Sequence, residues 1–564
     1  MPELLITLPL FLGAIAALVT RGRLRAVLML AAPFVGAYLL WSLDPNTNVT
    51  TSLMGMELTP VRLDRMAILF GYLFHLASLI GVIYSLHLKD TAQLVASLSY
   101  AACAVGAVCA GDLLTLFLYW EGLAVTSAIL ILARRSCRSL GAGFRYLVYQ
   151  ACSGMLLLAG ILLWMSQGND LRFDYIGIDT VAGKVLMLAF GIKACFTFLH
   201  SWLTDAYPEG TATGTVFLSA FTTKVGVYAL ARGFPGEEVL VYIGLAMACT
   251  PIFYAVVTND LRRVLAYSLI NQIGFMVVGI GIGTELALNG AVAHAFNDVL
   301  FKGLLMMSMG AILHVTGEMR GSHLGGFYKT MPKTAILCMV GAASISAFPL
   351  FNGFVSKSMI MSAAIYEGYD WVWLGLAFAA AGVFHHAGIK IPFFAFFAED
   401  SKLLRQGSQE PPRNMIIAMT IAASLCIGIG CYPQALYALL PYTNTYNPYT
   451  SGHVLSQLQL LAFASLAFVG LRMRGLYPEE KPSTHLDMEW TYRRLVPGAA
   501  SMVGRILLPT WTRLRLRLWT AVTQPLLDKV SHHRSEGSLA RHRPTGSMAL
   551  WVAVLLVTCL LLFY

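Results

Sequence analysis

Long apolar stretches of about 18 to 25 residues follow one another along most of the chain. A run of this length can cross the hydrocarbon core of a bilayer as an α-helix, in which every backbone polar group is satisfied internally. About sixteen such runs are present, near residues 2–19, 25–42, 66–87, 93–110, 113–133, 145–166, 183–203, 211–232, 238–258, 263–283, 287–314, 333–362, 372–397, 413–433, 454–471 and 547–563. The pattern predicts an all-α integral membrane protein with about 14 core transmembrane helices and two C-terminal transmembrane helices.

The composition agrees with a membrane protein. Hydrophobic residues make up 57% of the 564 residues and charged residues only 12%, with a mean hydropathy of +0.67. Soluble domains carry roughly 25% charged residues. The first apolar run starts directly after Met1 with Glu3 and no basic leader, so we expect a retained span rather than a cleaved signal peptide.

The basic residues gather in every second loop. They occur at Arg21, Arg23, Arg25, Lys89, Arg134, Arg135, Arg138, Arg145, Arg262, Arg263, Arg320, Lys329 and Lys333. If the N-terminus lies outside, all these clusters fall on the inner side, which is the positive-inside pattern. We therefore expect a multi-pass protein of the bacterial inner membrane with its N-terminus outside. The net charge of +10 reflects this orientation, and nucleic-acid binding is not expected.

The segment 472–546 differs from the rest because it is rich in arginine as well as Leu, Trp and Val, as in "RILLPTWTRLRLRLWTAV". One interpretation is an amphipathic segment that lies on the anionic inner surface of the bilayer. The other is a brace that lies along a neighbouring membrane subunit.

Motifs for enzyme chemistry are not found in the sequence. The ten cysteines mostly stand singly inside apolar runs, with no C-x-x-C pair to hold zinc or a cluster. The glycines of "GIGIG" at 279–283 follow no strand and are not a nucleotide fingerprint. We expect no cofactor, no metal site and no catalytic chemistry of the chain's own.

Seven ionisable residues lie inside the apolar runs and carry the strongest signal. They are Glu121, Lys193, Lys224, His294, Asp298, Lys302 and Lys357. A charge at the centre of a membrane helix costs about 2.5 to 3.5 kcal/mol, so each must face a partner or a polar cavity. A whole series of such residues favours proton transfer over structure alone.

Spacing supports this interpretation for the second half of the chain. His294, Asp298 and Lys302 are four residues apart, which places them on one helix face. Lys357 follows Pro349 and Gly353, which can interrupt a helix and free carbonyls to line a cavity.

Five further residues are secondary candidates. His200 and Asp205 lie at the inner end of their helix, where interfacial structure is the more common role. His385, His386 and Lys390 either belong to the path or are structural, by snorkelling or by closing an ion pair.

Several motifs resemble the antiporter-like membrane subunits of respiratory complex I (L-, M- and N-type), Mrp cation/proton antiporters (A- and D-type) and membrane-bound hydrogenases. The resemblance covers roughly residues 60 to 430. It rests on Glu121 in "YWEGL", Lys193 in "GIKACFTFLHSWLTDA" with His200, Trp202 and Asp205, Lys224 in "KVGVY", "NDLRRVLAYSLINQIG", the His294/Lys302 pair and Lys357 in "GFVSKSMI".

The resemblance implies two inverted five-helix repeats, each with a broken helix, with Lys193 and Lys357 as the corresponding charged residues. The D-type Mrp subunits are the nearest comparison, on "HHAGIKIPFFAFFAED" and Lys224, whereas the last two spans resemble the tail of L-type and hydrogenase subunits. The implied parts are helices 1–3 (1–92), the first repeat (93–235), the second repeat (236–400), helices 14–15 (401–471), the basic amphipathic segment (472–546) and the last helix (547–564).

The chain departs from the family pattern at specific positions. Phe198 and Thr204 stand where the family has prolines in and after helix 7, and Gly210 and Ala212 replace the two prolines of the next turn. Gln272 and Asp298 take the places of histidines. These departures leave open whether helix 7 breaks and whether the first half conducts.

The resemblance implies a proton-translocating subunit of a multi-subunit Mrp-type antiporter that exchanges protons for Na⁺ or K⁺. In the implied route Glu121 and Lys193 form an ion pair, Lys224 and the His294–Lys302 row pass protons on, and Lys357 is the last switch. An alternative is a proton-pumping subunit of a complex I-like NADH–quinone oxidoreductase or a membrane-bound hydrogenase. A third is a scaffold whose first half has lost transport. In each case the expected partners are other membrane subunits and the lipid bilayer.

Overall fold

The computed structural model describes residues 6–53, 55–406, 409–477, 487–505, 550–556 and 558. The chain divides into two units, Met1–Met488 and Glu489–Tyr564. Among the described residues, 12 helices are long and apolar enough to cross a membrane, and Leu8–Val19 and Pro332–Ile345 are shorter apolar helices. The chain is therefore a multi-span helical membrane protein.

The first part of the chain contains α1 (Leu8–Val19), α2 (Gly22–Ser42), β1 (Asn48–Leu53), β2 (Met56–Arg62), α3 (Arg65–Ser85), α4 (Thr91–Cys109), α5 (Leu113–Leu132), α6 (Cys137–Ser166), α7 (Val181–Lys193), α8 (Ser201–Ala206), η2 (Tyr207–Glu209), α9 (Gly214–Ala220) and α10 (Thr222–Gly233). The second part contains α11 (Glu238–Val257), α12 (Leu261–Ile282), α13 (Glu285–Thr316), η3 (Gly321–His323), η4 (Phe327–Lys329), α14 (Pro332–Ile345), α15 (Asn352–Tyr366), α16 (Asp370–Val383), η5 (Phe384–Lys390), η6 (Phe393–Phe397), η7 (Lys402–Gln406), α17 (Arg413–Cys431), α18 (Gln434–Tyr437), α19 (Ser451–Met473) and η8 (Thr491–Leu495).

Successive spans run in opposite directions, so the loops fall on two faces. One face carries the antiparallel hairpin of β1 and β2, which is fixed to the bundle by a 2.8 Å hydrogen bond from the Thr59 N–H to Asp112. We call it the hairpin face. The other carries the basic loops around residues 133–137, 258–260 and 317–331, and we call it the basic face.

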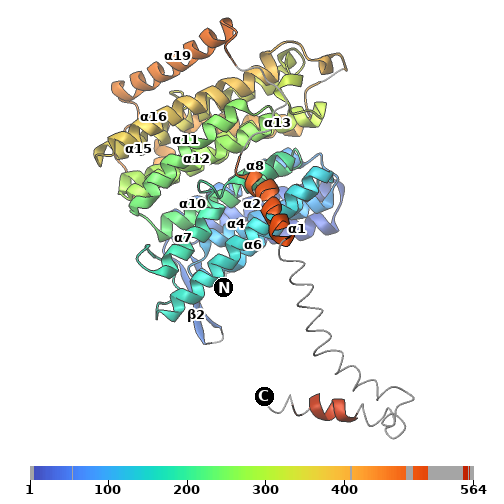
Figure 1. Cartoon of the computed structure of the whole chain (residues 1–564), viewed down its shortest axis with the longest axis vertical. Coiled ribbons are helices and arrows are strands. Elements are labelled where there is room, and N and C mark those ends of the chain that lie inside the picture. The colour runs from blue at the N-terminus through green and yellow to red at the C-terminus, as the bar shows by residue number, and fades with distance from the viewer. Residues whose placement is uncertain are drawn as a thin grey trace, which may run out of the picture. The chain divides into compact units, whose positions relative to one another are not determined.

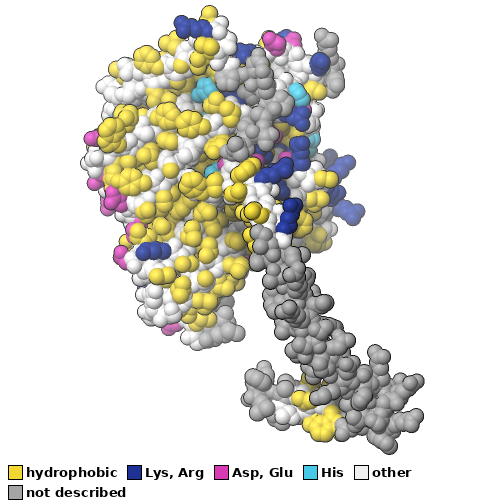
Figure 2. Space-filling view, in the orientation of Figure 1, with side chains coloured by type: hydrophobic (Ala, Val, Ile, Leu, Met, Phe, Trp, Pro, Cys, Tyr) yellow, Lys and Arg dark blue, Asp and Glu magenta, His cyan; other side chains and the backbone are white. Residues whose placement is uncertain are grey.

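The bundle of the first unit is made of roughly parallel helices, with α4, α6, α7 and α10 in one half and α11, α12, α13, α15 and α16 in the other (Figure 1). Apolar side chains cover most of the visible surface (Figure 2). In that view most Lys and Arg gather toward one side and most Asp and Glu toward the opposite side. A lipid-facing belt with charge at its two rims is the surface expected of a membrane bundle.

Two of the predicted spans are interrupted, as the resemblance implies for each repeat. The single runs predicted at 183–203 and 333–362 each divide into two helices, α7/α8 and α14/α15. The run at 372–397 begins as α16 and continues as the π-helical turns η5 and η6. Of the predicted last span at 547–563, only residues 550–556 and 558 are described, and they are helical. Most of the basic segment 472–546 lies outside the described residues.

A short backbone ladder occurs twice, once beside α5 and once beside α12. Asp112 and Asp260 cap the N-termini of α5 and α12 through their carboxylates. Next to each cap, one loop closes against another by the same pair of bonds. These bonds are Leu113 N–H to Leu171 O (2.9 Å) with Phe173 N–H to Gly111 O (2.9 Å), and Leu261 N–H to Met319 O (3.0 Å) with Gly321 N–H to Asn259 O (2.8 Å).

Candidate functional site

The helix carrying Lys193 is broken although it lacks the family proline. α7 ends at Lys193, and the residues two and five positions later, Cys195 and Phe198, have φ of 63° and 73°. This left-handed conformation cannot continue an α-helix of L-residues. The indole N–H of Trp202 donates a 2.9 Å hydrogen bond to the carbonyl of Ile192, which also accepts the Cys195 N–H at 3.2 Å, so the last turn before the break is held from α8. Loss of the proline therefore does not restore an ordinary helix.

A second break has the same backbone. α14 ends at Ile345, and Ala347 and Leu350 follow it by two and five residues with φ of 56° and 73°. The hydrogen bonds match those of the first break one for one. They are Ala194→Phe190, Cys195→Ile192, Phe196→Gly191 and Leu199→Phe196 in the first break, and Ser346→Ala342, Ala347→Ser344, Phe348→Ala343 and Phe351→Phe348 in the second.

Lys193 does not form the expected ion pair with Glu121 in this structure. Its Nζ, fully buried, donates to the carbonyl of Trp120 at 2.7 Å and lies 4.1 Å from the centre of the Trp120 ring. The carboxylate of Glu121 instead lies against Gly154 of α6, where an added Cβ would overlap it. Its Oε1 is buried and has no hydrogen-bond partner among the described residues. Neighbouring residues on α5 thus point the carbonyl and the carboxylate in different directions, which separates the two charges.

Lys357 lies on the far side of the second break and reaches back across it. Its Nζ donates to the carbonyl of Ile345, the last residue of α14, at 2.8 Å, and lies 5.1 Å from the centre of the Phe275 ring. A helix C-terminus carries partial negative charge, so a cation there is favourable. The predicted interruption between Pro349 and Gly353 is present, and Lys357 faces it.

The three ionisable residues of α13 are fully buried, and their side chains bind neighbouring helices rather than one another. His294 contacts Ser356 of α15 at 2.9 Å and Gln272 of α12 at 3.2 Å. Lys302 donates to Ser268 of α12 at 2.8 Å. The three side chains share one helix face, as the spacing predicts, and each makes its polar contact with a neighbouring helix.

Asp298 pairs with Lys224 of α10, with Nζ and Oδ2 at 2.5 Å and both side chains fully buried. This ion pair joins the two halves of the bundle. A histidine, which the family often has at position 298, would not supply a fixed negative charge to Lys224. The departure at Asp298 therefore provides the counter-charge.

The secondary candidates separate into different environments. Lys390 donates to the carbonyls of Val256 at 2.6 Å and Thr258 at 2.8 Å, which closes the C-terminal end of α11 and favours the structural interpretation. His385 packs against the rings of Phe468 and Tyr477. His386 is fully buried, and neither ring nitrogen has a hydrogen-bond partner in the described part of the chain.

His200 and Asp205 lie at the basic face, at the two ends of α8. Arg145 of α6 binds Asp205 in a two-pronged arrangement, with Nε–Oδ2 2.6 Å and Nη2–Oδ1 3.1 Å. Such paired bonds hold both side chains firmly. His200 Nε2 lies 3.3 Å from Oδ1 of Asp487, a residue that follows the last core helix.

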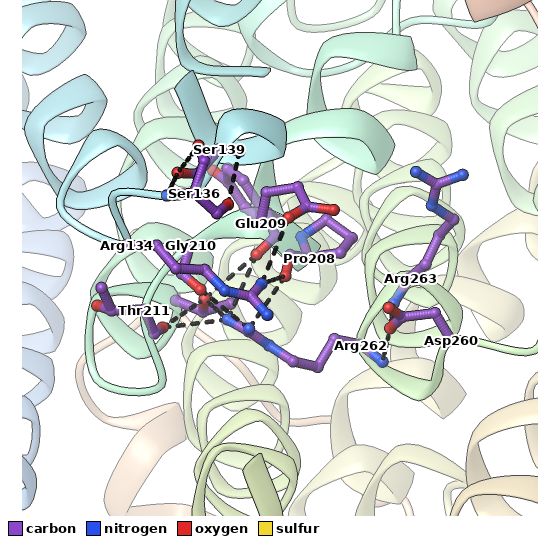
Figure 3. Close-up of polar contacts among 12 residues, drawn as sticks. Arg134, Ser136, Ser139, Pro208, Glu209, Gly210, Thr211, Asp260, Arg262 and Arg263 are labelled. Carbon is purple, nitrogen blue, oxygen red and sulfur yellow. Dashed lines mark hydrogen bonds and ion pairs between the residues drawn. The ribbon is translucent and has the colours of Figure 1, made fainter. Parts of the chain in front are cut away.

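Arg262 stands in the sequence only as part of a basic loop, yet it is 1% exposed and ties α12 to the first half. Its guanidinium donates to the carbonyls of Pro208 and Gly210, each at 3.0 Å, and of Thr211 at 3.1 Å, and also contacts Thr215 (Figure 3). Arg134 holds the Pro208 carbonyl from the other side at 2.9 Å (Figure 3). Two arginines thus fix the turn in which Gly210 and Ala212 replace the family prolines.

Sequence reasoning missed Trp120, Arg262 and Asp487 as parts of the site. Trp120 adjoins Glu121 and contributes its carbonyl and ring rather than an ionisable group. For Arg262, its place in the family-like stretch "NDLRRVLAYS" was an available signal. Nothing in the local pattern marks Asp487, which stands outside every recognised motif.

Residues 110–426, more than half of the chain, match the family described as "NADH:quinone oxidoreductase/Mrp antiporter, TM". The chain belongs to this family. The resemblance read from the sequence is confirmed, and the matched region contains both breaks and all seven primary candidate residues.

Named relatives come from two kinds of assembly. The D-type Na⁺/H⁺ antiporter subunit of Alkalihalophilus pseudofirmus is 28% identical over 356 residues, 59% of this chain and 72% of that protein. "Hydrogenase-4 component B" of Escherichia coli is 27% identical over 372 residues, 58% of this chain and 55% of that protein. A chain of the Mrp complex from Dietzia sp. DQ12-45-1b has the same fold, with a TM-score of 0.69 at 21% identity over 81% of this chain and 99% of the other.

Proposed function

We propose that this family member is the proton-translocating membrane subunit of a multi-subunit Mrp-type antiporter that exchanges Na⁺ or K⁺ for protons. The observation that carries the proposal is the series of fully buried lysines, Lys193, Lys224, Lys302 and Lys357, which extends through both halves of the bundle. Each costs free energy that an apolar residue would avoid. The D-type antiporter relative supports the ion-exchange activity.

The architecture that supports this function is a pair of inverted repeats. The repeated cap ladder at Asp112 and Asp260 and the matched breaks after Lys193 and Ile345 support the assignment of residues 93–235 and 236–400 to two related units. Equivalent helices such as α5 and α12 are five spans apart along the chain, and an odd offset of this kind turns one repeat over relative to the other. With the basic face inward, the N-terminus lies outside a bacterial inner membrane.

In the proposed route, protons move between buried sites, and each proton that arrives changes the electrostatic interactions of the next site. The Lys224–Asp298 pair lies where the two halves meet. Extra positive charge on Lys302 or Lys193 repels Lys224 and weakens that pair, because like charges interact strongly in a low-dielectric interior. Lys193 and Glu121, which are apart in this structure, form an ion pair in another charge state. Lys357, held by the carbonyl of Ile345, is the last switch.

Proton transport in vesicles tests the proposal. The complete complex is reconstituted, and a Na⁺ or K⁺ gradient drives proton movement that an internal pH dye reports. Lys357→Ala and Glu121→Ala are expected to lower the initial rate at least about tenfold, since each removes a group that must hold or release the moving charge. Lys329→Ala removes an exposed lysine of the basic face as a control and is expected to leave the rate unchanged. Wild-type rates in both test variants would overturn the proposal.

A second function is supported by the hydrogenase-4 component B relative. In that case the chain pumps protons for a redox complex and relies on other chains for electron transfer. Purification of the intact complex and identification of its chains separate the two: small membrane subunits alone support the antiporter, and iron–sulfur or nickel proteins support the redox complex.

A further inference from the structure

Asp487 enters the bundle from outside the region that matches the family. It follows α19, yet its side chain is only 1% exposed. Oδ1 lies 3.3 Å from Nε2 of His200, which immediately precedes α8, and Oδ2 accepts a 2.6 Å hydrogen bond from the hydroxyl of Tyr267 on α12. The carboxylate therefore lies between the broken helix of the first half and a helix of the second half.

The chain is also anchored just before this point. Tyr477, four residues beyond the end of α19, is 5% exposed and packs against the rings of His385, Phe394 and Phe468. Buried contacts at Tyr477 and at Asp487 mean that both positions are bound to the core. The contact of Asp487 with His200 is thus flanked by a second buried contact at Tyr477.

The two ring nitrogens of His200 have different surroundings. Nε2 faces Asp487, whereas Nδ1 is buried and has no hydrogen-bond partner among the residues that the structure describes. Thr197 Oγ1, in the break between α7 and α8, is likewise buried without a partner in the described part. An imidazole whose Nε2–H is held by a carboxylate can take up and release a proton at Nδ1. The ring has the arrangement that such a transfer requires.

The carboxylate keeps its charge in this position. Burial works to raise the pKa of Asp487, but the hydrogen bond and charge of His200, with the bonds from Tyr267 and the Met488 N–H, together hold it below its usual value. Asp487 is therefore ionised at neutral pH. A fixed negative charge beside Nε2 attracts a proton to the ring.

We propose that Asp487 and His200 form a carboxylate–imidazole pair that collects protons from the basic face and delivers them to the break after Lys193. His200 is the residue that carries the proton, and Asp487 positions the ring and stabilises its positive charge. In the neutral ring Nε2–H donates to the ionised Asp487, so an arriving proton binds at Nδ1, and the ring becomes neutral again when Nδ1 releases that proton to a water molecule in the break. This inference rests on the proposed transport of protons and adds an uptake site supplied by a residue outside the family motifs.

Other titratable groups surround Asp487 and must be considered in any pH measurement. Besides His200, they are Tyr267 of α12, Tyr254 of α11, which stacks on Tyr267, and Tyr149 of α6, which contacts Ser201. The ion pair of Arg145 and Asp205 lies next along α6 and α8. Tyrosines ordinarily titrate near pH 10, which is above the pH range of the test.

The test compares Asp487→Asn with Asp487→Glu in the reconstituted complex. Asn keeps a polar side chain of the same size but removes the charge, so we expect transport at about pH 8 to fall about tenfold, with a smaller loss at about pH 6, where protons are abundant. Glu restores the charge and is expected to recover most of the rate. Asp400→Asn is the matched control, because Asp400 is an acid of the same face that pairs with Lys329 while it is 58% exposed.

His200→Gln provides an independent measurement if Asp487→Asn does not assemble. Glutamine cannot carry a proton, so transport is expected to be low at both pH values. The inference is overturned if Asp487→Asn matches wild type at both pH values, or if it loses the same fraction at each and Glu gives no recovery, as a purely structural tether would. Should the wild-type complex itself move no protons, the proposed function fails, which is a distinct result.

Discussion

The break after Lys193 and the break after Ile345 share one backbone but place their lysines on opposite sides. In the first, the lysine is the last helical residue and turns to a neighbouring helix, where it meets the Trp120 carbonyl. In the second, Lys357 comes after the break and binds the carbonyl of the last helical residue, Ile345. The same hydrogen-bonded turn is therefore compatible with two positions for the buried charge.

The surroundings of the two breaks differ as well. Asp487, from the segment after α19, contacts His200 at the end of the first break. Gln457 of α19 donates a 3.0 Å hydrogen bond to the carbonyl of Ser346 in the second. The two breaks therefore differ in the charge of the group that reaches them from outside the repeats, a carboxylate at the first and a neutral amide at the second.

The largest effect is expected when the Lys224–Asp298 ion pair, which connects the two halves of the bundle, is broken. Asp298→Leu leaves Lys224 as a buried, unpaired charge, which should cost about 3 to 5 kcal/mol of the free energy of unfolding. Thermal unfolding of the purified protein measures it. The double variant Lys224→Leu/Asp298→Leu should recover much of the loss, because no buried charge remains. As a control, Asp400→Leu breaks the exposed pair with Lys329 and should cost less than about 1 kcal/mol. If Asp298→Leu costs no more than this control, Asp298 is not the counter-charge of Lys224.

The next largest effect is expected from a proline at position 198, within the first break. The family has proline there, but Phe198 has φ of 73°, which a proline ring cannot adopt. Phe198→Pro is expected to destabilise the protein by more than about 1 kcal/mol. Phe198→Ala, which keeps the possible backbone angles, serves as the control for side-chain loss. Stability of the proline variant equal to wild type in a melting experiment would mean that the first break adopts another backbone.

Glycine substitutions at equivalent positions have the smallest expected effect. Phe198 and Leu350 are 67% and 57% exposed, so little packing is lost when they are shortened. Relief of the left-handed conformation, about 1 to 2 kcal/mol, exceeds the entropic cost of glycine, about 0.5 to 1 kcal/mol. Phe198→Gly and Leu350→Gly should each raise the melting temperature slightly and by similar amounts. A gain at one break and a loss at the other would show that the two backbones are not equivalent.

The sequence alone was sufficient for the membrane class, the positions of most spans and the buried charged residues. These features follow from local composition, since an apolar run of sufficient length must cross as a helix and a charge within it stands out. The same reasoning located Lys193, Lys224, Asp298 and Lys357 before any contact was known, and the family motifs added the expectation of two repeats.

Only the tertiary structure decided which groups meet. Whether Lys193 faces Glu121 or the Trp120 carbonyl depends on how α5, α6 and α7 pack, and spacing along one helix does not determine it. The break after Lys193 survives without proline because bonds from elsewhere, such as the Trp202 N–H to Ile192, hold the last turn before it. Asp487 and Arg262 acquire their roles through contacts with residues distant in sequence, because a buried charge is stabilised by whatever the fold brings beside it.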